Sequence, residues 1–116
     1  MKKYIPLHVH THYSLLDGLS KPIDIANRCE KIGVPSCAIT DHGNISGCIQ
    51  FYSTMKSRGI KPILGTELYL CDQSPEVKDN SNKKLSHIVL LAKNLQGWKD
   101  LINIVSSSNK PEHYYY

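Results

Sequence analysis

The sequence predicts an α/β fold in which parallel β-strands alternate with α-helices. Short apolar runs bounded by turn-forming residues recur along the chain, as expected for buried strands. Between these runs lie segments whose apolar residues are three or four positions apart, as in amphipathic helices. The resulting order is strand, helix, strand, helix, strand, loop, strand, helix. Such alternation favours a parallel sheet with right-handed crossovers.

The first half of the chain supplies two strand–helix units. Residues 4–10 are expected to form the first strand. A helix follows with Ser20 as its N-cap, Pro22 in its first turn and Gly33 at its end, and its apolar face comprises Ile25, Ala26, Cys29 and Ile32. Residues 35–40 form the second strand and residues 41–44 the turn after it. The next helix ends at Gly59 and has an apolar stripe of Ile45, Cys48, Ile49, Tyr52 and Met55.

The second half contains two further strands and one helix. Residues 61–70 form the third strand, and the polar stretch 71–86 is a surface loop. Residues 85–92 form the fourth strand. Asn94 then caps a helix whose apolar face comprises Trp98, Leu101, Ile102 and Val105. The pattern lapses after Ser108, so residues 109–116 are expected to be a frayed tail.

Composition limits the class of protein. The chain has 116 residues, which is one domain or part of one, and 41% apolar residues are enough for a core. No run approaches the roughly 20 apolar residues of a transmembrane helix, and Pro6, His8 and His10 break the apolar run that a signal peptide needs. The four cysteines form no Cys-x-x-Cys pair, which favours buried thiols in a reducing cytoplasm. The net charge of +4 is compatible with a phosphate-bearing partner.

A candidate metal site begins at the end of the first strand. His8 and His10 are two residues apart, so their imidazoles project to the same side of a strand and can hold one ion together. The loop marked by Gly18 brings Asp17 back as a third candidate ligand. This mixture of imidazole and carboxylate suits a multi-metal phosphate site better than a structural zinc site, which usually uses cysteine pairs.

Further candidate ligands follow the later strands. Functional residues of parallel α/β folds lie at the carboxyl ends of strands, where we place His42 and Glu67. His87 belongs to the fourth strand, near its beginning. Paired divalent ions clamp a phosphate and activate water, so no serine or cysteine nucleophile is required. Glu67, as a bridging carboxylate, and His42 are the residues that we expect to act in catalysis.

Each of these residues also has a structural alternative. His8 and His10 could be ordinary strand residues that face water, and Asp17 and His42 could be turn residues. Glu67 could be a solvated strand end and His87 a core histidine. Asp41 is expected to be a structural hydrogen-bonding group rather than a ligand. The two remaining histidines receive no role: His12 is expected at the surface and His113 in the tail.

Four segments of the chain resemble the PHP (polymerase and histidinol phosphatase) family. They are LHVHT through SLLDG (residues 7–18), AITDHGN (38–44), GIKPILGTE (59–67) and HIVLLAKN with the following GW and Leu101 (87–101). Together they run in order over nearly the whole chain. The last two segments are most similar to the N-terminal PHP domain of the bacterial C-family replicative polymerases, the DNA polymerase III alpha subunits.

The resemblance implies a distorted (β/α)7 TIM-like barrel with up to three divalent ions, zinc, manganese or iron, at one mouth. It assigns metal-ligand positions to His8, His10, Asp17, His42, Glu67 and His87. It implies DNA replication as the setting, DNA, replisome subunits and an exonuclease subunit as partners, and 3′–5′ exonuclease-like phosphoesterase activity. A non-catalytic module of the polymerase and a small-molecule phosphatase acting on histidinol phosphate remain alternatives.

This chain departs from the family pattern in its length. Residues 1–108 would supply strands one to four of the barrel, while the remaining ligands and the polymerase module would lie beyond Tyr116. Half a barrel leaves sheet edges and apolar faces uncovered. We therefore expect the isolated piece to be marginally stable and weakly active or inactive.

Overall fold

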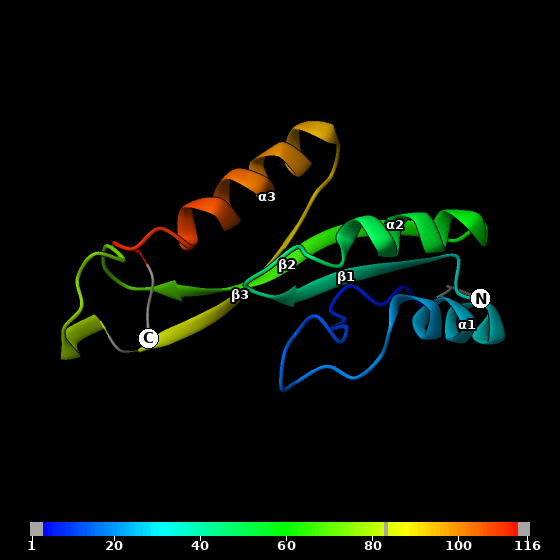
Figure 1. Cartoon of the computed structure of the whole chain (residues 1–116), viewed down its shortest axis with the longest axis horizontal. Helices are drawn as coiled ribbons and strands as arrows, with labels where there is room; N and C mark the ends of the chain where they lie inside the picture. Colours follow the sequence, from blue (N-terminus) through cyan, green and yellow to red (C-terminus); the bar gives the residue numbers. More distant parts are fainter. Residues whose placement is uncertain (1–3, 83, 114–116) are drawn as a thin grey trace.

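The computed structural model describes residues 4–82 and 84–113. Its elements are α1 (Pro22–Ile32), β1 (Ser36–His42), α2 (Cys48–Ser57), β2 (Lys61–Cys71), a 3₁₀ turn (Asn80–Asn82), β3 (Leu85–Leu91) and α3 (Leu95–Ser108). The three strands form one sheet in the order β1-β2-β3 (Figure 1). The mixed α/β class is confirmed, and the described residues form an open sheet rather than a closed barrel.

The expected all-parallel sheet is wrong at its last strand. β1 and β2 are parallel, with Ser36 opposite Lys61 and His42 opposite Glu67. β3 instead runs antiparallel to β2, with Tyr69 opposite His87. The described residues of the segment between them contain only a single 3₁₀ turn, whereas a parallel return needs a crossover of a dozen or more residues that is usually a helix. Without that helix the chain turns back on itself as a long hairpin.

The predicted first strand is an extended segment that runs beside β1 without a regular ladder. Ala38 and Thr40 donate their backbone N–H groups to the carbonyls of Pro6 and Val9, at 2.9 and 2.8 Å. In return, the Val9 N–H donates to the Thr40 hydroxyl at 2.8 Å rather than to a backbone carbonyl. Pro6 and Val9 are three positions apart, whereas Ala38 and Thr40, which bond to them, are two positions apart. The segment and β1 therefore do not form a regular ladder.

The hydrophobic core lies among α1, β1 and α2, and Trp98 of α3 packs against it. The stripe predicted for α2 is partly wrong. Its buried residues are Cys48, Phe51 and Met55, whereas Ile49 and Tyr52 are exposed. Spacing alone did not identify the buried face, because two overlapping apolar stripes are present on this helix.

The helix boundaries agree closely with expectation. Lys21 rather than Ser20 is the N-cap of α1, and the Asp24 carboxylate accepts the Lys21 N–H at 3.1 Å. Gly33 ends α1 in the left-handed conformation, with φ 69°. Asn94 caps α3 by accepting the Gly97 N–H at 3.0 Å. These ends are set by local contacts that short sequence patterns encode.

Two residues that were expected on the apolar faces of α1 and α3 are exposed. Ile32 of α1 and Ile102 of α3 are solvent-exposed, while Leu101 is the buried residue of α3. Residues 109–113, expected to fray, form turns in which the His113 ring lies 2.9 Å from the Ser107 carbonyl. Residues 114–116 of that expected tail lie outside the described residues. Among the described residues, no helix is both long and apolar enough to cross a membrane.

Candidate metal centre

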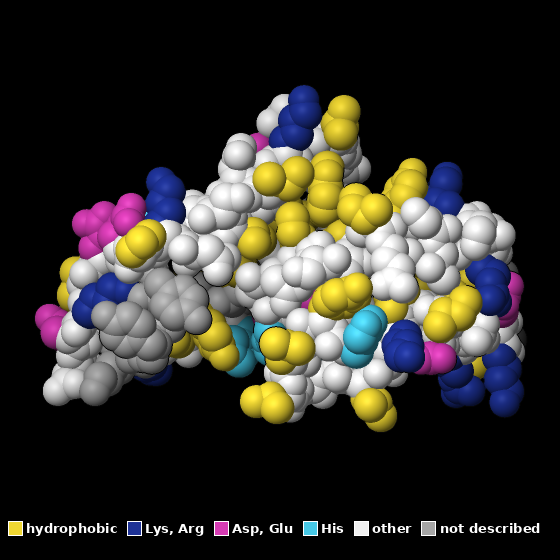
Figure 2. All heavy atoms as spheres, in the orientation of Figure 1, with side chains coloured by type: hydrophobic (Ala, Val, Ile, Leu, Met, Phe, Trp, Pro, Cys, Tyr) yellow, Lys and Arg dark blue, Asp and Glu magenta, His cyan; other side chains and the backbone are white. Residues whose placement is uncertain are grey.

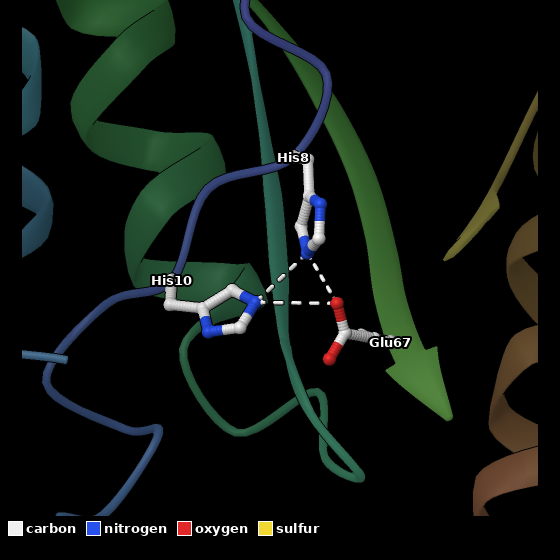
Figure 3. Close-up of side chains that lie close together, drawn as sticks. All are labelled: His8, His10 and Glu67. Atoms are coloured by element: carbon white, nitrogen blue, oxygen red, sulfur yellow. Dashed lines mark hydrogen bonds and ion pairs between the residues drawn. The ribbon is translucent and has the colours of Figure 1, made fainter. Parts of the chain in front are cut away.

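Two histidines from the N-terminal segment face one glutamate from β2. His8 and His10 point to the same side of the extended chain, as the alternation predicted, and their Nε2 atoms are 3.1 Å apart (Figure 3). The His8 Nε2 atom contacts Glu67 Oε2, and the His10 Nε2 atom is 3.6 Å from the same oxygen. The intervening residue, Val9, packs against the core on the opposite side. Partial burial of Val9 therefore helps to fix the direction of both rings.

Glu67 lies at the centre of the cluster. Its side chain is only 4% exposed, and its second oxygen, Oε1, is 2.8 Å from His42 Nδ1. The parallel register explains this contact, because His42 and Glu67 are directly opposite each other on β1 and β2. The carboxylate thus contacts three imidazoles and is shielded from solvent. The alternative of a solvated strand end is wrong.

Asp17 approaches the same imidazoles from the loop. Its Oδ2 atom is 2.7 Å from His10 Nδ1 and 3.0 Å from His42 Nε2. The hydrogen bond to His10, and then that to His42, lower the pKa of the Asp17 carboxyl group. The residue before it, Leu16, has φ 65°, a conformation that residues other than Gly, Asn and Asp rarely adopt. Asp17 directly follows this turn, and its carboxylate points toward His10 and His42.

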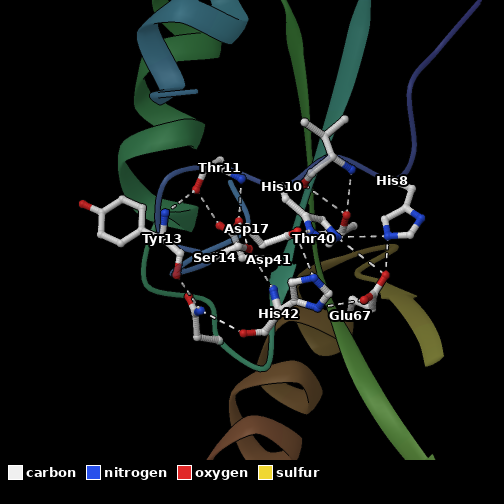
Figure 4. Close-up of polar contacts among 12 residues, drawn as sticks. His8, His10, Thr11, Tyr13, Ser14, Asp17, Thr40, Asp41, His42 and Glu67 are labelled. Atoms are coloured by element: carbon white, nitrogen blue, oxygen red, sulfur yellow. Dashed lines mark hydrogen bonds and ion pairs between the residues drawn. The ribbon is translucent and has the colours of Figure 1, made fainter. Parts of the chain in front are cut away.

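A buried carboxylate anchors the loop to β1. Asp41 accepts the Thr11 N–H at 2.6 Å, the Thr11 hydroxyl at 2.7 Å and the Ser14 hydroxyl at 2.7 Å (Figure 4). The Ser14 oxygen in turn accepts the His42 N–H at 3.0 Å. The structural role expected for Asp41 is confirmed by these contacts. Sequence reasoning missed Thr11 and Ser14, whose only signal was two small hydroxyl residues beside the histidine pair.

Gly18 closes the loop where no side chain fits. A Cβ atom at this position would be 1.9 Å from the Thr11 carbonyl oxygen. The Gly18 N–H donates to the Ser14 carbonyl at 2.8 Å, and the His12 N–H donates to the Ser20 carbonyl at 3.0 Å. The segment 11–20 is therefore held compactly on both sides of Asp17.

The donor atoms form two overlapping groups of three. One comprises His8, His10 and Glu67, and the other comprises His10, Asp17 and His42; within each group the donor atoms lie within 4.8 Å of one another. Ligands at about 2.0–2.2 Å from a tetrahedral ion are roughly 3.4 Å apart, close to the separations here. Two carboxylates and several imidazole nitrogens directed at common points are the donor set of a divalent cation. The residues present fit such an ion.

His87 lies at the edge of this cluster. Its ring is exposed, and its centroid is 6.3 Å from that of His42. The antiparallel direction of β3 explains why a residue near the start of a strand lies beside the carboxyl ends of β1 and β2. Neither group of three includes His87, so five of the six predicted ligands are brought together and the sixth is adjacent.

The two remaining histidines differ from each other. His12, expected at the surface, is half-buried; its ring packs against Tyr13 and its Nδ1 atom is buried without a hydrogen-bond partner among the described residues. His113 is remote in sequence and contacts Ser107 and Glu76 instead of the cluster.

Positive charge is not concentrated at the centre. Figure 2 shows histidine side chains in the middle of one face, while lysine and arginine side chains gather mainly toward the end formed by α1 and α2. Arg58, at the C-terminal end of α2, pairs with Glu30 at 2.5 Å. The net charge of +4 therefore says little about the chemistry of the cluster.

Solved structures share this fold. A protein described as a candidate metal-dependent phosphoesterase from Bifidobacterium adolescentis matches 89% of this chain and 33% of its own, with 22% identity and a TM-score of 0.62. An amidohydrolase from Chromobacterium violaceum matches 86% of this chain and 32% of its own, with 23% identity and a TM-score of 0.54. At these identities the likeness concerns the fold alone.

Relatives in sequence are more similar. DNA polymerase III subunit alpha of Borreliella burgdorferi is 44% identical over 115 residues, which are 97% of this chain and 10% of that protein. The subunit of the same name from Campylobacter jejuni is 44% identical over 116 residues, again 10% of its length. The chain thus spans about a tenth of the curated relatives that it matches. The family model described as PHP domain matches residues 6–116, and the chain therefore belongs to the PHP domain family.

Proposed function

We propose that this chain is the N-terminal PHP part of a bacterial DNA polymerase III alpha subunit and that its cluster binds divalent metal ions for phosphoester cleavage at the 3′ end of DNA. The observation that carries the proposal is the convergence of His8, His10, Asp17, His42 and Glu67 in two overlapping groups of donor atoms. The family and the names of the sequence relatives support the polymerase setting. That setting implies DNA and replisome subunits as partners, an exonuclease subunit among them, and a cytoplasmic location.

The position of each residue in the cluster indicates its role. Glu67 contacts donor atoms of both groups through its two oxygens, so we assign it the bridging role. Its burial keeps the carboxylate fixed and keeps water from competing for it. His42 contacts both carboxylates, one through each ring nitrogen, and holds them at a constant separation. We place His87 as an outer ligand on the open side.

Bound divalent ions supply a Lewis acid for phosphate oxygens and lower the pKa of water. The mixture of imidazoles and carboxylates suits zinc, manganese or iron. Asp17 and Glu67 balance the charge of such ions, and the exposed side of His8 leaves a path for a phosphate from solvent. None of these steps needs a serine or cysteine nucleophile.

Metal analysis of the purified chain tests the proposal. We expect at least one equivalent of divalent metal after dialysis, lost in the double variant His8→Ala/His10→Ala. His113→Ala is the matched control, since that histidine lies outside the cluster, and it should retain the metal. Circular dichroism checks that each variant is folded. A metal content that is zero in the parent chain, or unchanged in the double variant, contradicts the ligand assignment.

Cleavage is tested separately with a 5′-labelled single-stranded oligonucleotide. We expect slow shortening from the 3′ end that depends on added metal and disappears in Glu67→Gln. A chain that binds metal through these residues but leaves the DNA intact would favour the alternative of a non-catalytic module of the polymerase.

A further inference from the structure

An exposed tyrosine lies beside the cluster. Tyr69 is two residues beyond Glu67 on β2, so both side chains project from the same face of the strand. Successive side chains on one face are about 6.6 Å apart along a strand. The side chain of Tyr69 is 64% exposed, although a tyrosine ring is large enough to bury substantial apolar area.

A row of rings connects Tyr69 to the cluster. The centroids of His10 and His42 are 4.0 Å apart, those of His42 and His87 are 6.3 Å apart, and those of His87 and Tyr69 are 4.9 Å apart. Tyr69 and His87 are direct partners across the β2–β3 pair, which holds the two rings together. The tyrosine is therefore the outer end of a row whose inner end contacts both carboxylates.

Open space adjoins this tyrosine. Tyr69 contributes to the wall of a cavity of about 530 Å³, whose other walls are mainly apolar and include Leu68, Leu85 and Ile104. Gly43, which directly follows His42, also lines it. Pockets for small organic ligands have volumes of about 300–1,000 Å³ and mostly apolar walls. Tyr69, whose ring centroid is 4.9 Å from that of His87, is the side chain that this cavity shares with the row of rings.

We propose that Tyr69 is the stacking platform for the base of a nucleotide whose phosphate lies at the His8–His10–Asp17–His42–Glu67 cluster. This inference rests on the proposed function, which supplies the phosphate position. Stacking on an aromatic ring binds single-stranded nucleotides of any sequence, because every base has a π-face. A tyrosine side chain has only two rotatable torsions, so it loses little conformational freedom on binding, which favours this use.

Calorimetric titration of the manganese-loaded chain tests the platform. The two ligands are thymidine 5′-monophosphate and 2-deoxyribose 5-phosphate, which share the phosphate and sugar but differ in the base. We expect the nucleotide to bind at least about fivefold more tightly, the low end of the contribution of one stacked base. Tyr69→Ala should abolish the difference, and Tyr69→Phe should preserve it. Tyr52→Ala, an exposed tyrosine on α2 near the opposite end of β2, is the matched control and should change nothing.

The outcomes separate the two proposals. Equal affinities for the two ligands in the parent chain, or a preference for the nucleotide that survives Tyr69→Ala, overturn the platform while leaving the metal centre intact. If the chain takes up no manganese and binds neither ligand, the proposed function is overturned and the platform with it. Unchanged metal content and urea midpoint in Tyr69→Ala distinguish a lost base contact from a disturbed fold.

Discussion

Replacement of Asp41 by Ala should destabilise the protein strongly and loosen the cluster. The buried carboxylate of Asp41 accepts three hydrogen bonds at 2.6–2.7 Å from Thr11 and Ser14. Each hydrogen bond to a charged group contributes about 1.5–3 kcal/mol, and a buried donor left unpaired costs about 1–3 kcal/mol. The Thr11 and Ser14 hydroxyls can rotate to new partners, but the Thr11 N–H cannot. We therefore expect a loss of about 3–5 kcal/mol in the free energy of unfolding.

The conservative variant Asp41→Asn separates shape from charge. Asn retains one acceptor oxygen for the Thr11 N–H and keeps the volume of the side chain, so its cost should be about 1–2 kcal/mol. Metal affinity should fall in both variants and more in Asp41→Ala. The reason is that Ser14, which contacts Asp41, also accepts the His42 N–H.

Urea unfolding followed by tryptophan fluorescence measures these differences, because the single tryptophan, Trp98, packs against the core. The matched control is Asp79→Ala, an exposed aspartate in the loop whose partners are local, and it should leave the urea midpoint almost unchanged. If Asp41→Ala costs no more than Asp79→Ala, the anchoring role of Asp41 is wrong.

Further predictions concern the loop, the metal and the thiols. Gly18→Ala should reduce metal affinity at least tenfold, because its Cβ would overlap the Thr11 carbonyl. The control Gly33→Ala should cost only about 1–2 kcal/mol of stability and leave metal affinity unchanged. Equal metal affinities in the two variants would contradict this prediction. Metal at a hundred times its dissociation constant should raise the free energy of unfolding by about 2.7 kcal/mol, and a chelator should reverse the change; an unshifted urea midpoint argues against a site in the folded state. Burial raises the pKa of the Cys37 and Cys48 thiols to about 12, so at pH 8 only about 10⁻⁴ of each is thiolate. Both should resist alkylation until urea unfolds the chain, and rapid labelling of either in the native protein, read by mass spectrometry, would refute their burial.

The local part of the fold was predictable from short patterns. Gly33 and Asn94 mark helix ends correctly because capping depends on residues three or four positions away. The direction of β3 was not predictable from its own sequence, since an apolar strand can pair in either direction. The missing helix between β2 and β3 was the available signal, and it argued for an antiparallel return. The buried face of α2 was likewise undetermined, because Phe51 and Tyr52 offered two competing stripes.

By itself the sequence determined which residue types could hold a metal and that they follow apolar strands, because those facts depend on composition and on alternation along the chain. Only the tertiary structure decided which of them meet. The register that sets His42 opposite Glu67, and the antiparallel turn that brings His87 and Tyr69 to the same end of the sheet, arise from pairing between distant segments. The Asp41 anchor has the same origin: its three donors are 27 and 30 residues away, and their hydrogen bonds form only when the loop packs on β1. Contacts of that range depend on the whole packed chain, and no local pattern encodes them.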